Sequence, residues 1–212
     1  MHNLFQLLNF VWKHQSNKGA KISAILRVIR WQIASRLMPG LIVLPFFNKT
    51  YLFAKKGMTS ASSAWYCGLY EFEEMNFLFH YLKPGSLFVD VGANIGVYSI
   101  LAASKKAKVI AIEPISSSFE TLKKNILLNE FQEFIEPLNI GISDKTEFLN
   151  FSNDKDALNH VLLEDKKKDN NVKVNSHSLD EILNGRVPQF IKIDVEGYEN
   201  NIIEGAKETP VI

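Results

Sequence analysis

Residues 88–99 combine an apolar strand, an acidic side chain and a glycine turn, in the order F-V-D-V-G-A-N-I-G-V-Y-S. Gly92 and Gly96 carry no Cβ atom, so the backbone can adopt left-handed dihedral angles there and can approach a ligand closely. The free N–H groups at the start of the following helix attract a carboxylate or a phosphate. The turn, with Ala93 and Asn94 between its glycines, is therefore predicted to bind a small anionic or zwitterionic ligand.

Two classes of cofactor suit a strand followed by a glycine turn. The dinucleotide fingerprint requires the spacing G-x-G-x-x-G. Here the glycines follow G-x-x-x-G, and Asp90 precedes Gly92 by two residues. This D-x-G-x-x-x-G spacing is typical of S-adenosylmethionine sites, so it favours the methyl donor over NAD. The alternative is a plain tight turn that binds no cofactor. The neighbouring motifs distinguish between this alternative and a cofactor site.

A second apolar run, V-I-A-I-E-P at residues 109–114, ends in Glu113 and Pro114. A helix-sized segment, residues 97–104, separates this run from the glycine turn, which gives the strand–helix–strand order of a doubly wound α/β sheet. The carboxyl ends of neighbouring parallel strands line one crevice in such a sheet, so we expect Asp90 and Glu113 to lie side by side. We assign Glu113 to the ribose of the cofactor, with Pro114 beside it.

A third apolar strand, residues 190–193, leads into two carboxylates, Asp194 and Glu196. Methyl transfer to a hydroxyl needs alignment of the reacting atoms and is helped by a general base. Both carboxylates are catalytic candidates because they lie nearest the expected methyl position. Alternate residues of a strand face opposite ways, so only one of them points into the crevice unless the chain bends. We choose Asp194 for the catalytic and cofactor site; the alternative for Glu196 is to cap a helix that begins near Tyr198.

With this segment the sequence resembles the FkbM family of S-adenosylmethionine-dependent methyltransferases. The resemblance rests on residues 88–99, on I-E-P at 112–114, on G-I-S-D at 141–144 and on I-K-I-D-V-E-G-Y-E at 191–199. It runs from about Tyr51 to the C-terminus. It implies the Rossmann-like, doubly wound α/β sheet of class I methyltransferases, and O-methylation, often of sugars or secondary metabolites. It also favours Asp144 as the acceptor of a hydrogen bond from the adenine amino group, although on spacing alone Asp144 is equally well a turn residue.

The first 70 residues hold nine Lys or Arg and no Asp or Glu, although the whole chain of 212 residues has a net charge of only +1. We divide the chain into a basic N-terminal helical extension, residues 1–50, and a methyltransferase domain, residues 51–212. Residues 21–37 are a candidate contact with a membrane surface or a partner, or a helix that packs over the domain or pairs two subunits in a homodimer. Their apolar side chains recur at helical spacing: Ile22, Ile25, Leu26, Ile29, Ile33 and Leu37.

Composition limits the other function classes. The basic residues form no dense cluster with interleaved aromatic residues, so we expect no nucleic-acid partner. The sequence contains no run of roughly 18 apolar residues, and its N-terminus lacks the pattern of a signal peptide. We therefore expect a cytoplasmic protein, free or peripheral to the membrane. Cys67 is the single cysteine, and no third carboxylate accompanies Asp194 and Glu196 at a recognisable spacing, so we expect no metal site.

The end of the chain departs from the family pattern. The resemblance places the start of a fifth strand at residues 209–212, whereas class I methyltransferases usually carry seven strands. We expect a domain that is short, and incomplete, at its C-terminus. A hydroxyl of a small molecule or glycan is the favoured acceptor. A methyltransferase of another acceptor class, or a truncated cofactor-binding fragment without activity, is the alternative.

Overall fold

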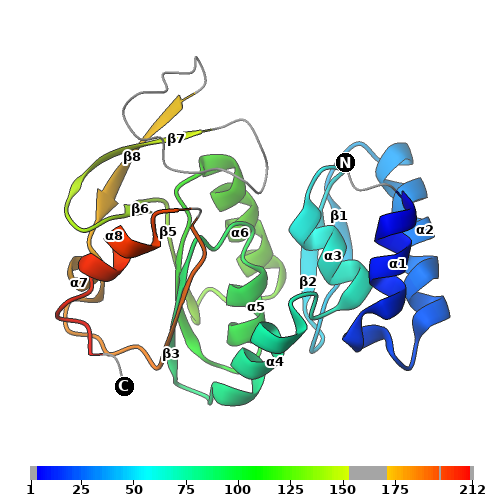
Figure 1. Ribbon diagram of the computed structural model, residues 1–212, viewed down its shortest axis with the longest axis horizontal. Coiled ribbons are helices and arrows are strands. Elements are labelled where there is room, and N and C mark those ends of the chain that lie inside the picture. The colour runs from blue at the N-terminus through cyan, green and yellow to red at the C-terminus, as the bar shows by residue number, and fades with distance from the viewer. Residues whose placement is uncertain (1–3, 153–170, 196, 211–212) are drawn as a thin grey trace. The chain divides into compact units, whose positions relative to one another are not determined.

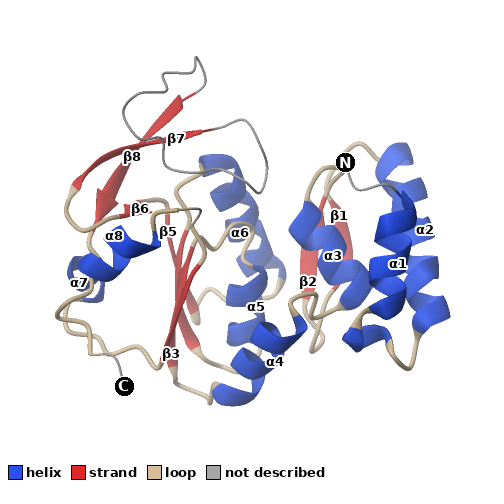
Figure 2. Ribbon diagram, in the orientation of Figure 1, coloured by secondary structure: helices blue, strands red, loops and turns tan. Residues whose placement is uncertain are grey.

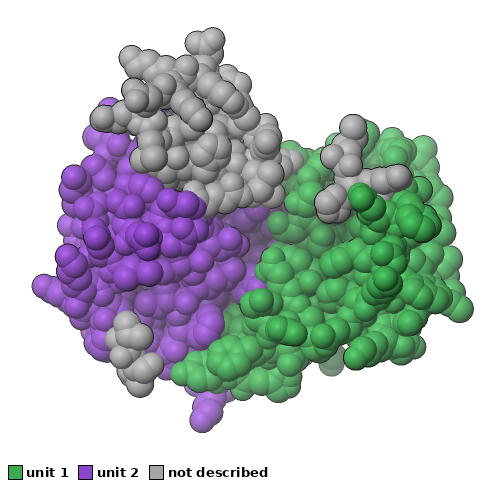
Figure 3. Space-filling view, in the orientation of Figure 1, with its two compact units in different colours: residues 1–81 green, residues 82–212 purple. Residues whose placement is uncertain are grey.

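The computed structural model describes residues 4–152, 171–195 and 197–210. The chain forms two compact units, Met1–Tyr81 and Leu82–Ile212, which are coloured separately in Figure 3. In the part of the chain that the structure describes, no helix is both long enough and apolar enough to cross a membrane.

The first unit is mostly helical (Figures 1 and 2). Its elements are α1 (Leu4–Lys13), a 3-10 helix η1 (Gln15–Asn17), α2 (Lys21–Leu37), β1 (Ile42–Pro45), β2 (Tyr51–Ala54), α3 (Thr59–Cys67) and α4 (Phe72–Tyr81). The helix predicted over residues 21–37 is confirmed. β1 and β2 pair antiparallel, and Asn48 and Lys49 in the turn between them have positive φ values of 53° and 64°, as is common in hairpin turns.

The boundary between the two units lies later than the sequence placed it. The predicted division between residues 50 and 51 falls inside the β1–β2 hairpin, whose two strands are hydrogen-bonded to each other. Both strands contact α3, and α3 contacts α2. The hairpin therefore belongs with the helices that precede it.

α2 is buried along one face only. Arg27 fixes this helix beside α3, because its Nη2 donates to the Tyr66 carbonyl at 2.6 Å and to Asn17 Oδ1 at 2.9 Å. The buried residues of α2 recur at helical spacing and are Ala24, Val28, Trp31 and Ser35. Most of the apolar residues that stand out in the sequence lie exposed on the opposite face: Ile22, Leu26, Ile29, Ile33 and Leu37.

The second unit is built on a parallel sheet of four strands. They are β3 (Leu87–Val91), β4 (Lys108–Ile112), β5 (Ile135–Leu138) and β9 (Phe190–Ile193), in the order β5-β4-β3-β9. α5 (Val97–Ala103) connects β3 to β4, and α6 (Ser116–Leu128) connects β4 to β5. The strand order reverses beside β3, which is the property of a doubly wound sheet that creates a crevice for ligands. The predicted α/β fold class is confirmed.

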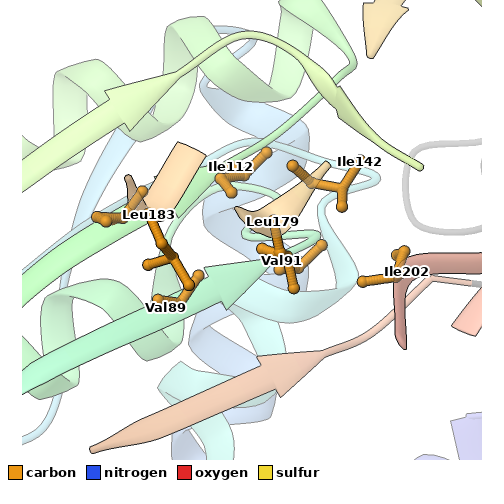
Figure 4. Close-up of a cluster of buried hydrophobic side chains, with 8 residues drawn as sticks. Val89, Val91, Ile112, Ile142, Leu179, Leu183 and Ile202 are labelled. Carbon is orange, nitrogen blue, oxygen red and sulfur yellow. The ribbon is translucent and has the colours of Figure 1, made fainter. Parts of the chain in front are cut away.

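Helices cover both faces of this sheet. Side chains two residues apart on a strand point the same way, and Val89, Val91, Ile110 and Ile112 form one buried cluster with α7 (Leu179–Leu183) and α8 (Glu199–Glu204), as Figure 4 shows. α5 and α6 lie on the other face (Figure 1). Asp90 alternates with Val89 and Val91, so its side chain enters the layer between the sheet and α5.

A second sheet has the order β6-β8-β7, formed by β6 (Gly141–Ile142), β7 (Glu147–Ser152) and β8 (Asn171–His177). The sequence predicts an inserted antiparallel arm from Thr146 to Ser176, with strands over 148–151 and 172–174 on either side of a charged tip at 164–171. The antiparallel pairing of β7 with β8 confirms this arm. Apart from residue 171, the tip lies outside the described residues.

The sequence also predicts a single strand over residues 135–142, ending at Ser143 and Asp144. That prediction is wrong, because the chain forms β5 and β6 in different sheets. Asn139 lies at the break. Its Nδ2 donates to the carbonyls of Glu113 and Pro114, at 2.8 and 3.1 Å, so a side chain bonds these carbonyls where a continuing strand would use its backbone.

A buried asparagine joins α6 to the loop after β3. Asn125 is fully buried, and its Nδ2 donates to the Ile95 carbonyl at 2.8 Å. We expect Asn125→Leu to lower the free energy of unfolding by about 1–3 kcal/mol, the cost of leaving a buried carbonyl without its partner. Lys124→Leu places the same side chain at the exposed neighbouring position and should change this free energy by less than about 0.5 kcal/mol. Urea denaturation of both variants measures the difference, and equal effects would contradict this role for Asn125.

Candidate functional site

The chain turns directly after β3, at the two predicted glycines. The N–H groups of Gly92 and Ala93 both donate to the Ile112 carbonyl, at 3.0 and 2.9 Å, and the N–H of Gly96 donates to the Ala93 carbonyl at 2.8 Å. Gly92, Asn94 and Gly96 have positive φ values of 77°, 52° and 87°. These left-handed positions let the turn close within a few residues and hold it against the end of β4.

Close packing within the protein requires the glycine at position 92 and also crowds position 96. A Cβ atom at Gly92 would overlap the backbone carbonyl oxygen of Asp194 at the end of β9, and one at Gly96 would overlap Leu122 of α6. The sequence interpretation assigned these glycines to the close approach of a ligand. The structure gives each of them a protein neighbour as well, so Gly92 sets how closely the ends of β3 and β9 approach.

Glu113 joins the turn after β4 to the turn after β3. Its Oε2 accepts a hydrogen bond from the N–H of Asn94, and its Oε1 accepts one from the N–H of Ile115, both at 2.8 Å. Burial raises the pKa of this carboxyl to about 7, although the two backbone hydrogen bonds act in the opposite direction. Glu113 therefore fixes the orientation of Asn94 within the glycine turn, in addition to any contact with a ligand.

Asp90 is buried between β3 and α5. Its Oδ2 accepts a hydrogen bond from Ser99 Oγ at 2.6 Å. Its Oδ1 is also buried and has no hydrogen-bond partner among the described residues, while Lys192 Nζ lies 4.0 Å from it. Burial raises the pKa of Asp90, and the charge of Lys192 opposes this. A buried acceptor without a partner is costly, so a ligand that brings a hydrogen-bond donor to this end of β3 is favoured.

Lys192 lies among the candidate site residues, and the sequence interpretation missed it. It is paired with Asp90 in the register of β3 and β9. Its Nζ donates to Asp194 Oδ2 at 2.8 Å and lies 4.8 Å from the centre of the Tyr98 ring. The Lys192 side chain is only 16% exposed, whereas that of Asp194 is 67% exposed. The available signal was a charged residue inside the apolar strand 190–193, because a buried lysine is nearly always paired.

Tyr198 connects the last motif to the region of Asp144. Its hydroxyl lies 3.3 Å from Ser143 Oγ, and Ser143 Oγ donates to Asp144 Oδ1 at 3.0 Å. The rest of the Tyr198 side chain packs on a small apolar cluster of Ile115, Leu149 and Val174. Tyr198 therefore brings residues that follow β4, β6 and β9 into one group.

The predicted site residues fall into three groups. The first group lies at the ends of three adjacent strands and consists of Asp90 with the glycine turn, Glu113 with Pro114, and Asp194. These strands end level with one another, because Val91 is in register with both Ile112 and Ile193. Asp144 is linked to the other motifs through Ser143 and Tyr198. Glu196 lies outside the described residues.

The first group combines a tight backbone turn with three carboxylates and one buried lysine. Carboxylates accept hydrogen bonds from hydroxyl and ammonium groups, and together they favour a ligand with positive charge. These residues therefore fit the zwitterionic, ribose-containing methyl donor that the spacing of the motifs favours. In the described ranges, no three His, Cys, Asp or Glu side chains gather as they would around a metal ion.

Comparison with known proteins places these motifs in one family. A model of the methyltransferase FkbM domain matches residues 90–211. The chain is similar to hexuronic acid methyltransferase AglP of Haloferax volcanii, with 30% identity over 119 residues that make up 55% of this chain and 48% of that protein. It is also similar to methyltransferase sdnD of Sordaria araneosa, with 25% identity over 60% of this chain and 62% of that protein. The chain thus covers less than two thirds of the length of either relative.

Among solved structures, the chain is similar to P. horikoshii TYW2 in complex with MeSAdo. The sequence identity between the two is 29% and the TM-score is 0.40, over 49% of this chain and 37% of that chain.

Gly92→Ala tests whether close packing against Asp194 requires this glycine. Gly85 is a matched control, because its φ is also positive, 84°, and a Cβ there would meet no atom within 4 Å. We expect Gly92→Ala to lower the free energy of unfolding by about 1–3 kcal/mol more than Gly85→Ala, since the overlap with a backbone carbonyl can be relieved only by moving a strand end. Chemical denaturation measures both variants. Equal losses would mean that only the dihedral angle matters at Gly92.

The raised pKa of Glu113 makes the stability of the fold depend on pH. This carboxyl ordinarily titrates at 4.5 and does so at about 7 in the folded chain. Between these values the folded state holds a proton that the unfolded state has released, so the free energy of unfolding falls as the pH rises through this window. The stability lost is on the order of 3 kcal/mol.

Denaturation of the wild type and of Glu113→Gln, from about pH 4 to about pH 8, isolates this contribution. The free energy of unfolding of the wild type minus that of the variant should fall with rising pH and become constant above about pH 7. The charge of Asp90 is one of the causes that raise the pKa of Glu113, so the difference between the two proteins includes this interaction. A difference that stays constant over the whole range would show that the pKa of Glu113 is not raised.

Proposed function

This chain belongs to the FkbM family of S-adenosylmethionine-dependent methyltransferases, and on that premise we propose that it transfers a methyl group from S-adenosylmethionine to a hydroxyl of a sugar, glycan or secondary metabolite. The resemblance inferred from the motifs is confirmed by the family match, which covers Asp90, Glu113, Asp144 and Asp194. The similarity to a hexuronic acid methyltransferase supports a sugar as the acceptor.

One observation carries the proposal for the donor site. The residues after β3, β4 and β9 meet where the strand order reverses, which is the position of ligand sites in doubly wound sheets. We assign the methionine end of the donor to Asp90 and to the turn formed by Gly92, Ala93, Asn94 and Gly96.

The nucleoside end of the donor is assigned to residues that follow the neighbouring strands. Each oxygen of Glu113 accepts one backbone hydrogen bond and retains a lone pair that can accept another from a ribose hydroxyl. Pro114 lies beside Glu113, and Asp144 is assigned to the adenine amino group.

Asp194 is the proposed general base. The bound donor supplies an electrophilic methyl group on a sulfonium, so the protein has to align the acceptor oxygen with that group and remove the hydroxyl proton. Asp194 is mostly exposed and can meet an acceptor from solvent, while Lys192 Nζ holds its Oδ2 at 2.8 Å. We therefore assign Lys192 a positioning role, in which it orients the Asp194 carboxylate beside the turn. Glu196 remains a second candidate for the base.

We expect Asp194→Asn to lower kcat by about two to four powers of ten, the usual contribution of a general base, and to change the affinity for S-adenosylhomocysteine by less than tenfold. Labelled methyl donor with a panel of sugars and hexuronic acids measures the rate, and calorimetry measures the affinity. Glu204→Gln removes a carboxylate from an exposed position of α8 and serves as the control.

The same measurements separate the alternatives. Binding of NAD in place of S-adenosylhomocysteine would contradict the donor assignment, and binding of S-adenosylhomocysteine without turnover on any acceptor would favour an inactive fragment. An unchanged kcat of Asp194→Asn with an acceptor would show that Asp194 is not the base for it. A carboxylate acceptor, which has no proton to lose, would give that result.

A further inference from the structure

The exposed face of α2 carries a continuous row of large apolar side chains. They follow one another at intervals of three or four residues, so they form one line along the helix. We call this row the α2 stripe, and it consists of Ile22, Leu26, Ile29, Ile33 and Leu37, each between 45% and 76% exposed. Single exposed apolar residues are normal on a protein surface, but a contiguous row of five indicates an interaction site.

The first unit does not need the α2 stripe for its own core. At about 100° per residue the stripe lies on the side of the helix opposite to the buried face, and that face already packs through Ala24, Val28, Trp31 and Ser35. Arg27 further fixes the rotation of α2 through its bonds to the Tyr66 carbonyl and Asn17. The α2 stripe therefore faces away from the core of the first unit, and the packing and hydrogen bonds of α2 hold the helix in this orientation.

Positive charge accompanies the α2 stripe on both sides. Arg30 and Arg36 are exposed, and helical geometry puts them about 60° to either side of the row. At the N-terminal end of the helix, Lys21 Nζ lies 5.2 Å from the centre of the Trp12 ring, and Trp12 is itself 45% exposed. No Asp or Glu occurs in the first 70 residues, so the whole region complements a negatively charged partner.

We propose that the α2 stripe docks on the surface of a membrane that contains anionic lipids. An apolar row bordered by arginines suits the boundary between headgroups and acyl chains, where the row leaves water and the cations meet phosphate groups. Trp12 suits the same boundary, since its ring is apolar and its N–H is polar. A second copy of the chain would bring the same cations together, and a nucleic acid would leave the apolar row exposed.

Flotation with vesicles tests this proposal on the full chain and does not depend on its enzymatic activity. Vesicles of phosphatidylcholine alone are compared with vesicles that also contain phosphatidylglycerol. We expect the wild type to float with the mixed vesicles, and to bind those of phosphatidylcholine alone at least about tenfold more weakly. Added salt should weaken binding to the mixed vesicles, because it screens the attraction of arginines to headgroups.

Two double variants separate the apolar and the charged parts of the surface. Ile29→Glu with Ile33→Glu should reduce binding to the mixed vesicles by at least about tenfold. Arg30→Gln with Arg36→Gln should reduce it about fivefold for each arginine and leave the weak binding to phosphatidylcholine nearly unchanged. Leu127→Glu replaces an apolar residue of α6 that is 59% exposed and should bind as the wild type does. Circular dichroism and thermal melting confirm that each variant is folded.

Three results would overturn the proposal. The first is a wild-type protein that binds neither kind of vesicle in the flotation experiment. The second is equal binding by Ile29→Glu with Ile33→Glu and by Leu127→Glu. The third is a wild-type dimer in solution that this double variant converts to a monomer without any vesicle binding, because the stripe would then be covered by a second copy of the chain.

Discussion

The missing side chain at Gly92 is the constraint on which the site depends. Because no Cβ stands there, the carbonyl of Asp194 can approach the end of β3, and the N–H of Asp194 donates to the Val91 carbonyl at 3.1 Å. On the other side, the Ile112 carbonyl accepts from both Gly92 and Ala93. Backbone hydrogen bonds thus lock three strand ends together, and the carboxylates of Glu113 and Asp194 flank the turn as a consequence.

Charge determines what such a site can bind. Asp90 and Glu113 are buried, and desolvation raises the pKa of both. Lys192 is the cation that the structure places beside Asp90 and Asp194, so the carboxylates around it outnumber it. A raised pKa favours the neutral form of these carboxyl groups, and a ligand with positive charge favours the ionised form, because Coulomb attraction is stronger in a buried site than in water. This electrostatic argument, which is independent of the sequence motif, favours a cationic methyl donor over an anionic dinucleotide.

The sequence predicted features that depend on neighbouring residues and missed those that depend on distant ones. Local patterns were sufficient for the strands that carry Asp90 and Glu113 and for the β7–β8 arm. They were also sufficient for the β1–β2 hairpin, which the apolar runs 41–47 and 51–54 around Asn48 and Lys49 predict. The role of Lys192 depends on the β3–β9 register, and the break at Asn139 depends on carbonyls that precede it by more than 20 residues. Hydrophobicity alone would bury the isoleucines of α2, yet small residues such as Ala24 and Ser35 let this helix pack closely by its other face. Spacing shows that a helix is amphipathic, and only the packed structure shows which face is covered.

The distribution of charge along the chain gives the two units different electrostatic environments. The first unit, residues 1–81, carries nine Lys or Arg against three Glu, whereas the second, residues 82–212, carries 15 Lys or Arg against 20 Asp or Glu. A uniform mixture with the same net charge of +1 would attract neither an anionic surface nor a cationic ligand. With the charges separated, the docking that we propose would draw the first unit to phosphate headgroups, while the carboxylates of the second unit keep their preference for a positively charged donor. The separation of charge therefore allows one chain to combine these two opposite preferences.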